Sequence, residues 1–253
     1  DATVTGRIFD KDVRFATGGT DHYAVIGIHS FTEPGIYPFR MVATDVSGQQ
    51  GIYESLIRVV DGGYGRETID IPPERENLLD PAVVQLELDR VEMLMSGYTD
   101  EKLFAGLMSL PSTGPVTSQY GTRRSYNGSA YNTFHGGADF GGSPGSLILA
   151  PSDGMVVLAE PLQVRGNAVI LDHGRGVYTG YWHQTELFVQ AGQFVRRGDA
   201  LGTLGETGLV TGAHLHWEMW VSGVQVDPLQ WLAHDFDQFN QVDEPADSTA
   251  FDG

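Results

Sequence analysis

Histidine and aspartate residues gather in two short stretches of the second half of this chain. His214 and His216 lie two positions apart, and residues i and i+2 of an extended strand project from the same face. Upstream, His135 and Asp139 lie four positions apart. The Gly-Gly pair between them makes a helix unfavourable, so we expect a loop that enters a strand. We predict that the two stretches meet around a single metal ion.

The residue types of the chain restrict the chemistry of this ion. The chain has no cysteine, so the metal ligands must come from His, Asp or Glu. A catalytic zinc ion takes three protein ligands and leaves one position for water, whose pKa falls to about 7. His135, Asp139 and one histidine of the His214/His216 pair would complete such a set. The other histidine would act as an acid or base or stabilise an oxyanion, and His183 is a further candidate for this role.

Glu218 follows His216 by two positions and would share its face of the strand. We interpret Glu218 as a carboxylate that accepts a hydrogen bond from an imidazole N–H and so fixes the tautomer of a ligand. A direct role as catalytic base is the alternative, but the two histidines already supply groups for proton transfer.

The composition excludes several classes of function. The chain has 253 residues, 33 glycines, a hydrophobic fraction of 41% and a formal net charge of -18, which suits a turn-rich, mainly β globular protein. This negative charge disfavours nucleic acid and anionic lipid as partners, and without cysteine there are no disulfide partners. No apolar run reaches the roughly 18 residues of a membrane span. The sequence begins at Asp1, so we expect a processed or truncated chain that lacks its signal peptide or anchor.

The elements that must position the candidate residues are mainly β-strands. Residues 1–75 are predicted to form a small N-terminal β-sandwich-like domain, because short β-rich runs alternate with turns and residues 37–43 show a period of two. Residues 76–109 are predicted to form a helical connector, in which Asp80 is the N-cap and Pro81 lies in the first turn.

The chain changes character after this connector. Residues 110–234 contain strand-like runs separated by glycines, and they are predicted to form a compact domain of antiparallel β-structure. Residues 235–253 are acidic and poor in aliphatic side chains, and they are predicted to be a disordered tail. The fold class predicted for the whole chain is therefore mainly β.

The C-terminal half, from about Pro111 to Leu232, resembles the M23 family of zinc metallopeptidases, also called lysostaphin-like or LytM-type. The matching motifs are specific, follow the order found in the family and cover about half of the chain. They are Ser118-Gln-Tyr-Gly-Thr-Arg-Arg, His135-Gly-Gly-Ala-Asp-Phe, Ala150-Pro-Ser-Asp-Gly, Leu171-Asp-His-Gly-Arg-Gly, Tyr181-Trp-His, Val195-Arg-Arg-Gly-Asp-Ala-Leu-Gly, Gly205-Glu-Thr-Gly, Thr211-Gly-Ala-His-Leu-His-Trp-Glu and Val226-Asp-Pro-Leu. One departure is Ala213, where relatives often have proline. The resemblance implies a LytM-type peptidase fold for this half.

The resemblance also implies roles for individual residues. It assigns zinc binding to His135, Asp139 and His216. It assigns proton transfer and transition-state stabilisation to His183 and His214, and it leaves open which of the two takes the proton from water.

The family hydrolyses peptide bonds in bacterial peptidoglycan. The resemblance therefore implies a zinc-dependent endopeptidase that uses zinc-bound water as the nucleophile and acts outside the cytoplasm on stem or cross-bridge peptides. Which bond is cleaved stays open. Arg123 and Arg124 are candidates to bind a substrate carboxylate, although a structural salt bridge fits them at least equally well. Arg123 is preferred, because it fills the Gly-x-Arg of the family-like motif.

Two alternatives remain at this point. A LytM-type domain can lose catalysis and serve as a wall-binding or amidase-activating module, in which case an envelope protein would be its partner. The complete set of ligands in this sequence favours an enzyme, since degenerate relatives typically lack one or more of them. The N-terminal domain could also occlude the cleft and keep the peptidase latent.

Overall fold

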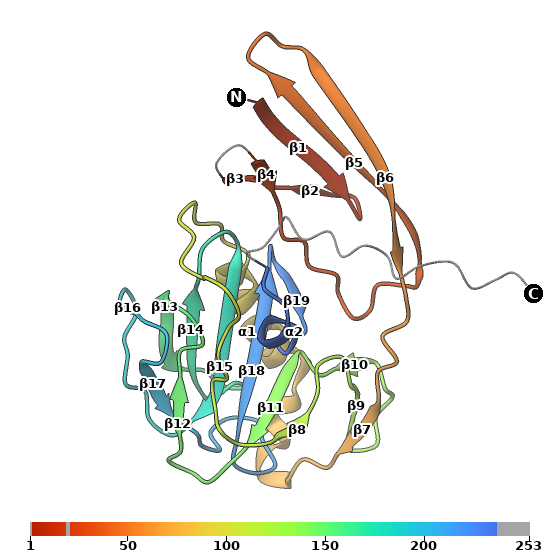
Figure 1. The fold of residues 1–253 in the computed structure, drawn as a ribbon. Helices are drawn as coiled ribbons and strands as arrows, with labels where there is room; N and C mark the ends of the chain where they lie inside the picture. Colours follow the sequence, from red (N-terminus) through yellow and green to blue (C-terminus); the bar gives the residue numbers. More distant parts are fainter. Residues whose placement is uncertain (1, 19–20, 237–253) are drawn as a thin grey trace, which may run out of the picture.

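The structure, a computed structural model, describes residues 2–18 and 21–236 (Figure 1). Residues 237–253, which make up most of the predicted acidic tail, lie outside this described part. Strands dominate the molecule, which confirms the mainly β fold predicted from the sequence. Within the described residues, no helix has the length and apolar character needed to cross a bilayer.

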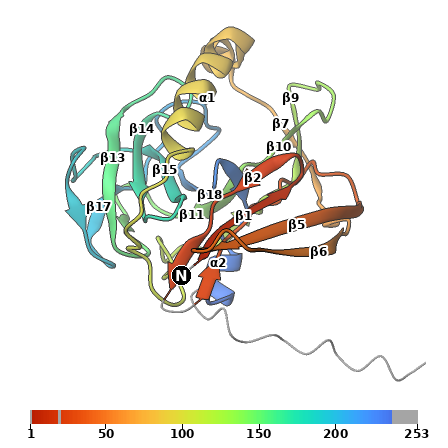
Figure 2. The same cartoon turned by 90° about the horizontal axis from the view of Figure 1, so that it is seen from above.

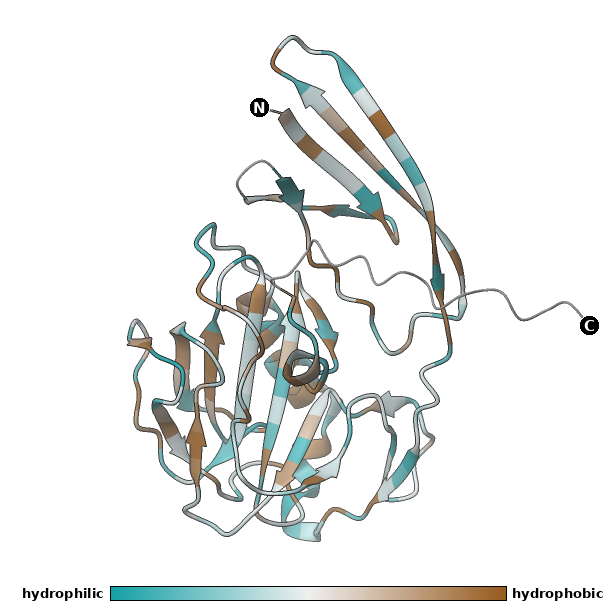
Figure 3. Ribbon diagram, viewed as in Figure 1, coloured by the Kyte–Doolittle hydropathy of each residue, from teal (hydrophilic) through white to brown (hydrophobic). Residues whose placement is uncertain are grey.

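The N-terminal strands are β1 (Ala2–Ile8), β2 (Lys11–Val13), β3 (Ala16–Gly18), β4 (Asp21–Tyr23), β5 (Gly35–Asp45) and β6 (Gln50–Val59). Four of them form an antiparallel sheet with strand order β2-β1-β5-β6, and β3 pairs with β4 as a short ribbon. Tyr37 and Phe39 of β5 are half-buried between exposed neighbours, as the period of two predicts. Along β6 only alternate residues of the second half are half-buried, and Figure 3 shows hydrophilic and hydrophobic bands mixed along this strand. The sheet projects away from the rest of the described chain (Figure 1).

Three elements lead from this sheet into the C-terminal half. They are β7 (Arg66–Ile69), the short 3-10 helix η1 (Pro73–Leu79) and the helix α1 (Pro81–Met95). The Asp80 side chain accepts a hydrogen bond of 2.8 Å from the backbone N–H of Ala82, which confirms its predicted role as the N-cap of α1. The sequence signal at Asp80 therefore places the start of this helix correctly.

The C-terminal half contains the remaining elements. They are β8 (Val116–Ser118), β9 (Arg123–Tyr126), β10 (Thr133–Phe134), β11 (Gly137–Gly141), β12 (Leu147–Leu149), β13 (Gly154–Pro161), β14 (Asn167–Asp172), β15 (Val177–Gln184), β16 (Phe194–Val195), β17 (Ala200–Thr203), β18 (His214–Val221), β19 (Val224–Val226) and the short helix α2 (Gln230–Ala233). A large antiparallel sheet has the strand order β16-β13-β14-β15-β18-β11-β8, and β19 pairs with β18. A smaller sheet has the order β10-β9-β7, in which β7 runs parallel to β9. Thus β7, which lies ahead of α1 in the chain, belongs to a sheet of the C-terminal half.

Apolar side chains cover both faces of the large sheet. Every residue of β15 is buried, and so is every residue of β18 after the first. Trp217 of β18 belongs to the larger apolar cluster. On the opposite face Trp220 packs with Val91 and Met95 of α1, and α1 lies beside β15 in Figure 2. His216 shares the face of Trp220, because alternate residues of a strand point the same way.

Candidate metal centre and active site

Strand pairing brings the two predicted stretches together. In the antiparallel pair of β11 and β18, Asp139 lies directly opposite His216, and His135 lies two residues before β11 begins. His135 Nε2, Asp139 Oδ1 and His216 Nδ1 form a triangle with sides of 2.9, 2.8 and 2.8 Å. All three residues are buried. The three predicted metal ligands therefore converge on one point.

Hydrogen bonds on the far side of each imidazole fix the position of its proton. His135 Nδ1 lies 3.0 Å from the carbonyl oxygen of Gln119, which can only accept, so Nδ1–H donates and Nε2 keeps a lone pair. His216 Nε2 lies 3.2 Å from Glu218 Oε1, so Nε2–H donates and Nδ1 keeps a lone pair. Glu218 thus makes the contact expected of a carboxylate that orients a ligand.

The donor atoms of the triangle fit a bound metal ion. Two imidazole lone pairs and one carboxylate oxygen point at one another at less than 3 Å, with no proton between them. This arrangement is repulsive unless a cation lies among the donors. Two imidazoles and one carboxylate form a ligand set that divalent zinc accepts with a coordination position to spare.

His183 and His214 lie beside the triangle, and their ring centroids are 4.9 Å apart. Each ring is anchored through Nδ1, since His183 donates to the carbonyl oxygen of Thr207 at 2.8 Å and His214 to that of Gly212 at 2.9 Å. Each Nε2 therefore keeps a lone pair. His214 Nε2 lies 3.7 Å from Asp139 Oδ1, so this lone pair is next to the metal ligands.

A bulge in β15 turns His183 toward the site. The pairing of β14 with β15 shifts register between Tyr181 and Gln184, and His183 has a φ of 66°, in the left-handed region that residues with a side chain rarely adopt. Regular alternation would place His183 on the face of Tyr181, whereas its ring instead packs beside His214. Bulges next to active sites commonly redirect a side chain in this way.

Burial favours the neutral form of two imidazoles of the site, His183 and His135. It holds the pKa of His183 well below its usual value, and the nearby rings of His214 and His216 lower it further. Burial also lowers the pKa of His135 to about 4, although the carboxylate of Asp139 opposes this shift. A neutral imidazole is required both of a general base and of a metal ligand.

Residues 133–228 match the model of peptidase family M23. The matched range contains the three residues of the triangle and both of the histidines beside it. This chain carries a peptidase family M23 domain.

Relatives of the M23 domain are similar over the same region. This chain is 35% identical over 115 residues to the peptidoglycan DD-endopeptidase ShyA of Vibrio cholerae, covering 46% of this chain and 27% of ShyA. It is 42% identical over 96 residues to an uncharacterized metalloprotease of Haemophilus influenzae, covering 38% of this chain and 20% of that protein. The matched part therefore spans less than a third of the length of either relative.

A solved structure extends the similarity beyond the M23 domain. A protein of Pseudomonas aeruginosa described as a peptidase M23 superposes with a TM-score of 0.67 and 26% identity, covering 90% of this chain and 87% of that chain. Because this coverage is far larger than the M23 domain, the similarity includes N-terminal strands as well as the peptidase fold.

The metal triangle opens into a groove of about 290 Å³. Its lining combines the loop of residues 209–214 with Glu67, Ile69 and Ile71, which precede α1 and the M23 domain. Arg75 of η1 donates a hydrogen bond of 2.8 Å to the carbonyl oxygen of Val210, so the two parts of the lining are tied together. No motif or periodicity in the sequence predicts that residues so far upstream line the groove.

The arginines at the end of the Ser118–Arg124 motif point to different places. Arg123 donates to the carbonyl oxygen of Ser30 at 2.7 Å and lies over the ring of Phe31, so it holds the segment between β4 and β5. It does not line the groove, and this placement gives no support to the predicted role of Arg123 in substrate binding. Arg124 instead donates to Asp139 Oδ2 at 2.9 Å, a salt bridge whose partner the sequence did not indicate.

Buried charges continue from His216 to α1. Burial alone would raise the pKa of Glu218, but Arg165 and the hydrogen bond from His216 outweigh it and lower the pKa to about 2. Arg165 also donates to Glu87 of α1 at 3.1 Å, and Glu87 accepts the backbone N–H of Arg165 at 2.9 Å. The carbonyl oxygen of Arg165 in turn accepts the backbone N–H of His183 at 2.8 Å. Helix α1 therefore helps to fix the backbone of His183.

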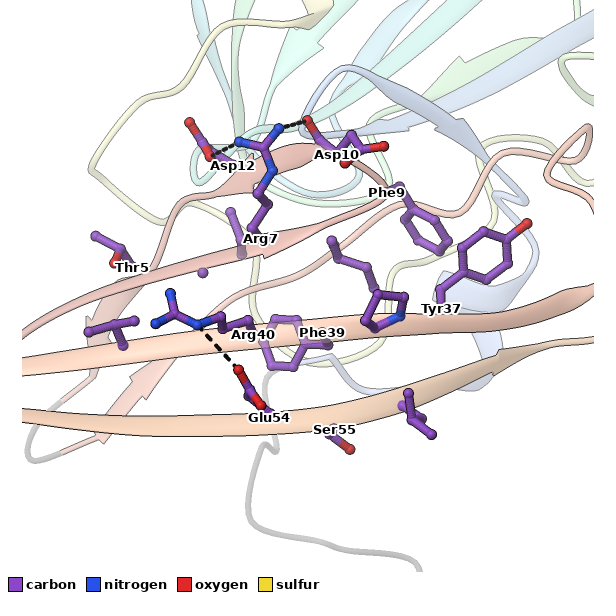
Figure 4. A pocket seen from close by; sticks show the side chains of 16 residues that line it. Thr5, Arg7, Phe9, Asp10, Asp12, Tyr37, Phe39, Arg40, Glu54 and Ser55 are labelled. Carbon is purple, nitrogen blue, oxygen red and sulfur yellow. Dashed lines mark hydrogen bonds and ion pairs between the residues drawn. The ribbon is translucent and has the colours of Figure 1, made fainter.

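A larger hollow, of about 900 Å³, lies on the N-terminal sheet (Figure 4). Its guanidinium groups are engaged by neighbours, since Arg7 lies 3.5 Å from Asp12 and Arg40 lies 3.4 Å from Glu54. Its lining contains none of the predicted site residues. The groove of the M23 domain therefore remains the candidate active site.

Proposed function

We propose that this chain is a zinc-dependent endopeptidase that hydrolyses peptide bonds of bacterial peptidoglycan outside the cytoplasm. The observation that carries the proposal is the convergence of three ligand lone pairs beside two histidines that each keep a lone pair on Nε2. The substrate class is supported by the M23 match and by the name of the relative ShyA, a peptidoglycan DD-endopeptidase.

In this proposal His135, Asp139 and His216 hold the zinc ion. Bound zinc supplies Lewis acidity toward a carbonyl group and makes water more acidic. The hydrogen bonds from His135 to Gln119 and from His216 to Glu218 keep both imidazoles in the tautomer that binds metal. These residues therefore present a preorganised set of ligands.

His183 and His214 transfer the protons in this proposal. Each Nε2 can accept a proton from water and return it to the amine that leaves, while each Nδ1–H stays bonded to a backbone carbonyl oxygen. His183 is buried and the His214 side chain is 21% exposed, so His214 is the one that meets the groove more directly. Both rings are anchored in the same way, and their order of action is a question for kinetics.

The test is hydrolysis of purified sacculi by the zinc-loaded protein. We expect release of muropeptides by the wild type, and mass spectrometry of the fragments identifies the bond that is cleaved. His216→Ala should abolish both zinc binding and release. His234→Ala removes an exposed histidine that does not line the groove, and this matched control should keep both properties.

Two results would contradict the proposal. Zinc-loaded wild type that binds sacculi but releases no fragments would favour a wall-binding or amidase-activating module. Equal release by the wild type and by His216→Ala would show that hydrolysis does not use this site.

A further inference from the structure

Strand β7 lies ahead of α1 and outside residues 133–228, yet one of its side chains contacts residues that touch the candidate metal ligands. We propose that Glu67 of β7 and Arg124 of β9 are positioning residues that hold Asp139 and His135 in place for the metal ion. The inference rests on the zinc site of the proposed function. It makes a segment upstream of the M23 domain part of the metal centre.

The first step is the contact of Arg124 with Asp139. Asp139 Oδ1 faces the two ligand histidines, and its other oxygen, Oδ2, accepts from Arg124 at 2.9 Å. The Arg124 and Asp139 side chains are only 12% and 10% exposed, so water screens this pair weakly. Fixing Oδ2 fixes the rotation of the carboxylate, and with it the direction of the lone pair on Oδ1.

The second step is the contact of Glu67 with Arg124. The Nε of Arg124 donates to Glu67 Oε2 at 3.2 Å, which leaves the other end of the guanidinium group for Asp139. Glu67 also balances the positive charge of Arg124. Without Glu67, only Asp139 would balance the charge of Arg124, and Asp139 must also bind the cation. A guanidinium group next to a bound cation repels it strongly in a buried site.

Ser118 extends the same network to a second ligand. Its hydroxyl lies 3.2 Å from Glu67 Oε2 and 3.2 Å from His135 Nδ1, and it accepts from Arg124 at 3.2 Å. Oε2 of Glu67 is thus linked to Asp139 by Arg124 and to His135 by Ser118. Two of the three metal ligands depend on one upstream residue.

The backbone holds Glu67 in place. Glu67 and Arg124 are directly opposite in the parallel pair of β7 and β9, so their side chains lie on the same face. Backbone hydrogen bonds hold the two strands together at both ends. The N–H of Arg123 donates to the carbonyl oxygen of Gly65 at 2.9 Å, and the N–H of Asn127 donates to that of Ile69 at 3.0 Å. Strand pairing therefore sets this contact, in which the Arg124 side chain is 12% exposed and the Glu67 side chain 37%.

The experiment measures zinc affinity of the full chain by competition with a chelator. Arg124→Gln is expected to weaken zinc binding by about 10-fold or more, as is typical of residues that orient metal ligands. Glu67→Gln should cause a smaller but measurable loss, because Glu67 contacts the ligands only through Arg124 and Ser118. The combined loss in the double variant should be smaller than the product of the two single losses, because Glu67 acts largely through Arg124. The melting temperature of the metal-free protein, measured in parallel, separates a loss of affinity from a loss of folding.

Glu74→Gln is the matched control, because Glu74 is an exposed glutamate of the neighbouring η1 that makes no contact with the groove. It should bind zinc as the wild type does. If Glu67→Gln folds poorly, Glu67→Asp, whose shorter side chain retracts the carboxylate from Arg124, should show the same loss of affinity.

Zinc affinities of the Glu67 and Arg124 variants equal to that of the wild type would overturn this inference and leave the proposed function standing. Fully additive losses in the double variant would also overturn it. A wild-type protein without affinity for zinc would instead refute the proposed function.

Discussion

The two halves of the chain bury their strands very differently. Every residue of β15 is buried, whereas Ile52 and Leu56 of β6 are more than half exposed. Metal ligands must be held within fractions of an ångström, and closely packed strands provide that rigidity. The candidate site therefore lies in the half of the chain where both faces of the sheet are covered. The N-terminal sheet instead leaves large apolar side chains, such as Ile52 and Leu56, exposed to solvent.

The same substitution placed in each half gives the largest expected contrast. Leu171 of β14 is fully buried, and Leu56 of β6 is 69% exposed. Leu171→Ala should lower the free energy of unfolding by about 2 to 5 kcal/mol, and Leu56→Ala by about 0.5 kcal/mol or less. Tryptophan fluorescence during urea denaturation reports on the C-terminal half, because all four tryptophans lie there. Equal losses of stability in the two variants would show that the two halves do not differ in packing as described.

Acid should destabilise the C-terminal half through His173. Its ring donates to the carbonyl oxygen of Asp153 and contacts the Thr179 hydroxyl, and burial lowers its pKa from 6.5 to about 4. The unfolded chain therefore binds more protons between these values. Stability is complete above about pH 6.5 and falls by about 3 kcal/mol as the pH drops through 4.

Urea denaturation at several pH values between 7.5 and 4 measures this effect. His173→Asn removes the titrating ring, so it should flatten this part of the pH profile. A profile of the same slope in both proteins would assign the acid sensitivity to other groups.

Glu87 links α1 to the closely packed sheet of the C-terminal half, because it bonds to Arg165 between β13 and β14. Its side chain is 7% exposed and pairs with Arg165, which is 13% exposed. Glu87→Gln weakens this pair and leaves Arg165 without its full counter-charge, so we expect a loss of about 2 kcal/mol in the free energy of unfolding. Glu92→Gln, an exposed glutamate of the same helix, is the control and should change stability by less than about 0.5 kcal/mol.

A lower rate of sacculus hydrolysis is also expected for Glu87→Gln, because Glu87 holds the turn that fixes the backbone of His183. Stability and hydrolysis equal to those of Glu92→Gln would show that α1 merely covers the sheet.

The smallest effect is expected where the two halves meet. Arg123 bonds to Ser30 and lies 4.2 Å from the ring centroid of Phe31. Arg123→Ala should cost about 1 kcal/mol or less and should leave the hydrolysis of sacculi nearly unchanged. A large loss of hydrolysis with an unchanged melting temperature would instead support the substrate-binding role predicted from the sequence.

Local patterns were enough to predict much of the site. A period of two places His214 and His216 on one face of β18, and the N-cap signal at Asp80 marks the start of α1. The register that sets Asp139 opposite His216 depends on which strands pair, and no local pattern contains that information. The residue types alone suggested that the two stretches share a metal ion, and the family resemblance implied which three residues bind it.

Other parts of the site depend on irregular or distant structure. His183 reaches the site through a bulge and a left-handed backbone conformation, whereas strict alternation would have sent it to the other face. The contact of Glu67 with Arg124 joins residues 57 positions apart. It requires β7 and β9 to pair in parallel although the chain between them forms α1 and β8. No sequence pattern in that connection predicts this pairing. The division of the chain at residue 75 stays a prediction, with β7 pairing across it.

The pairing of β7 with β9 also limits how this protein could be recombined. Exchange of modules between related chains at α1, where the sequence suggests a natural joint, would separate Glu67 and Arg75 from their partners Arg124 and Val210. A functional hybrid would need its crossover point ahead of Gly65, so that β7 is inherited together with the peptidase. Shuffling of the N-terminal sheet during evolution is therefore expected to preserve the residues from β7 onward as one heritable unit.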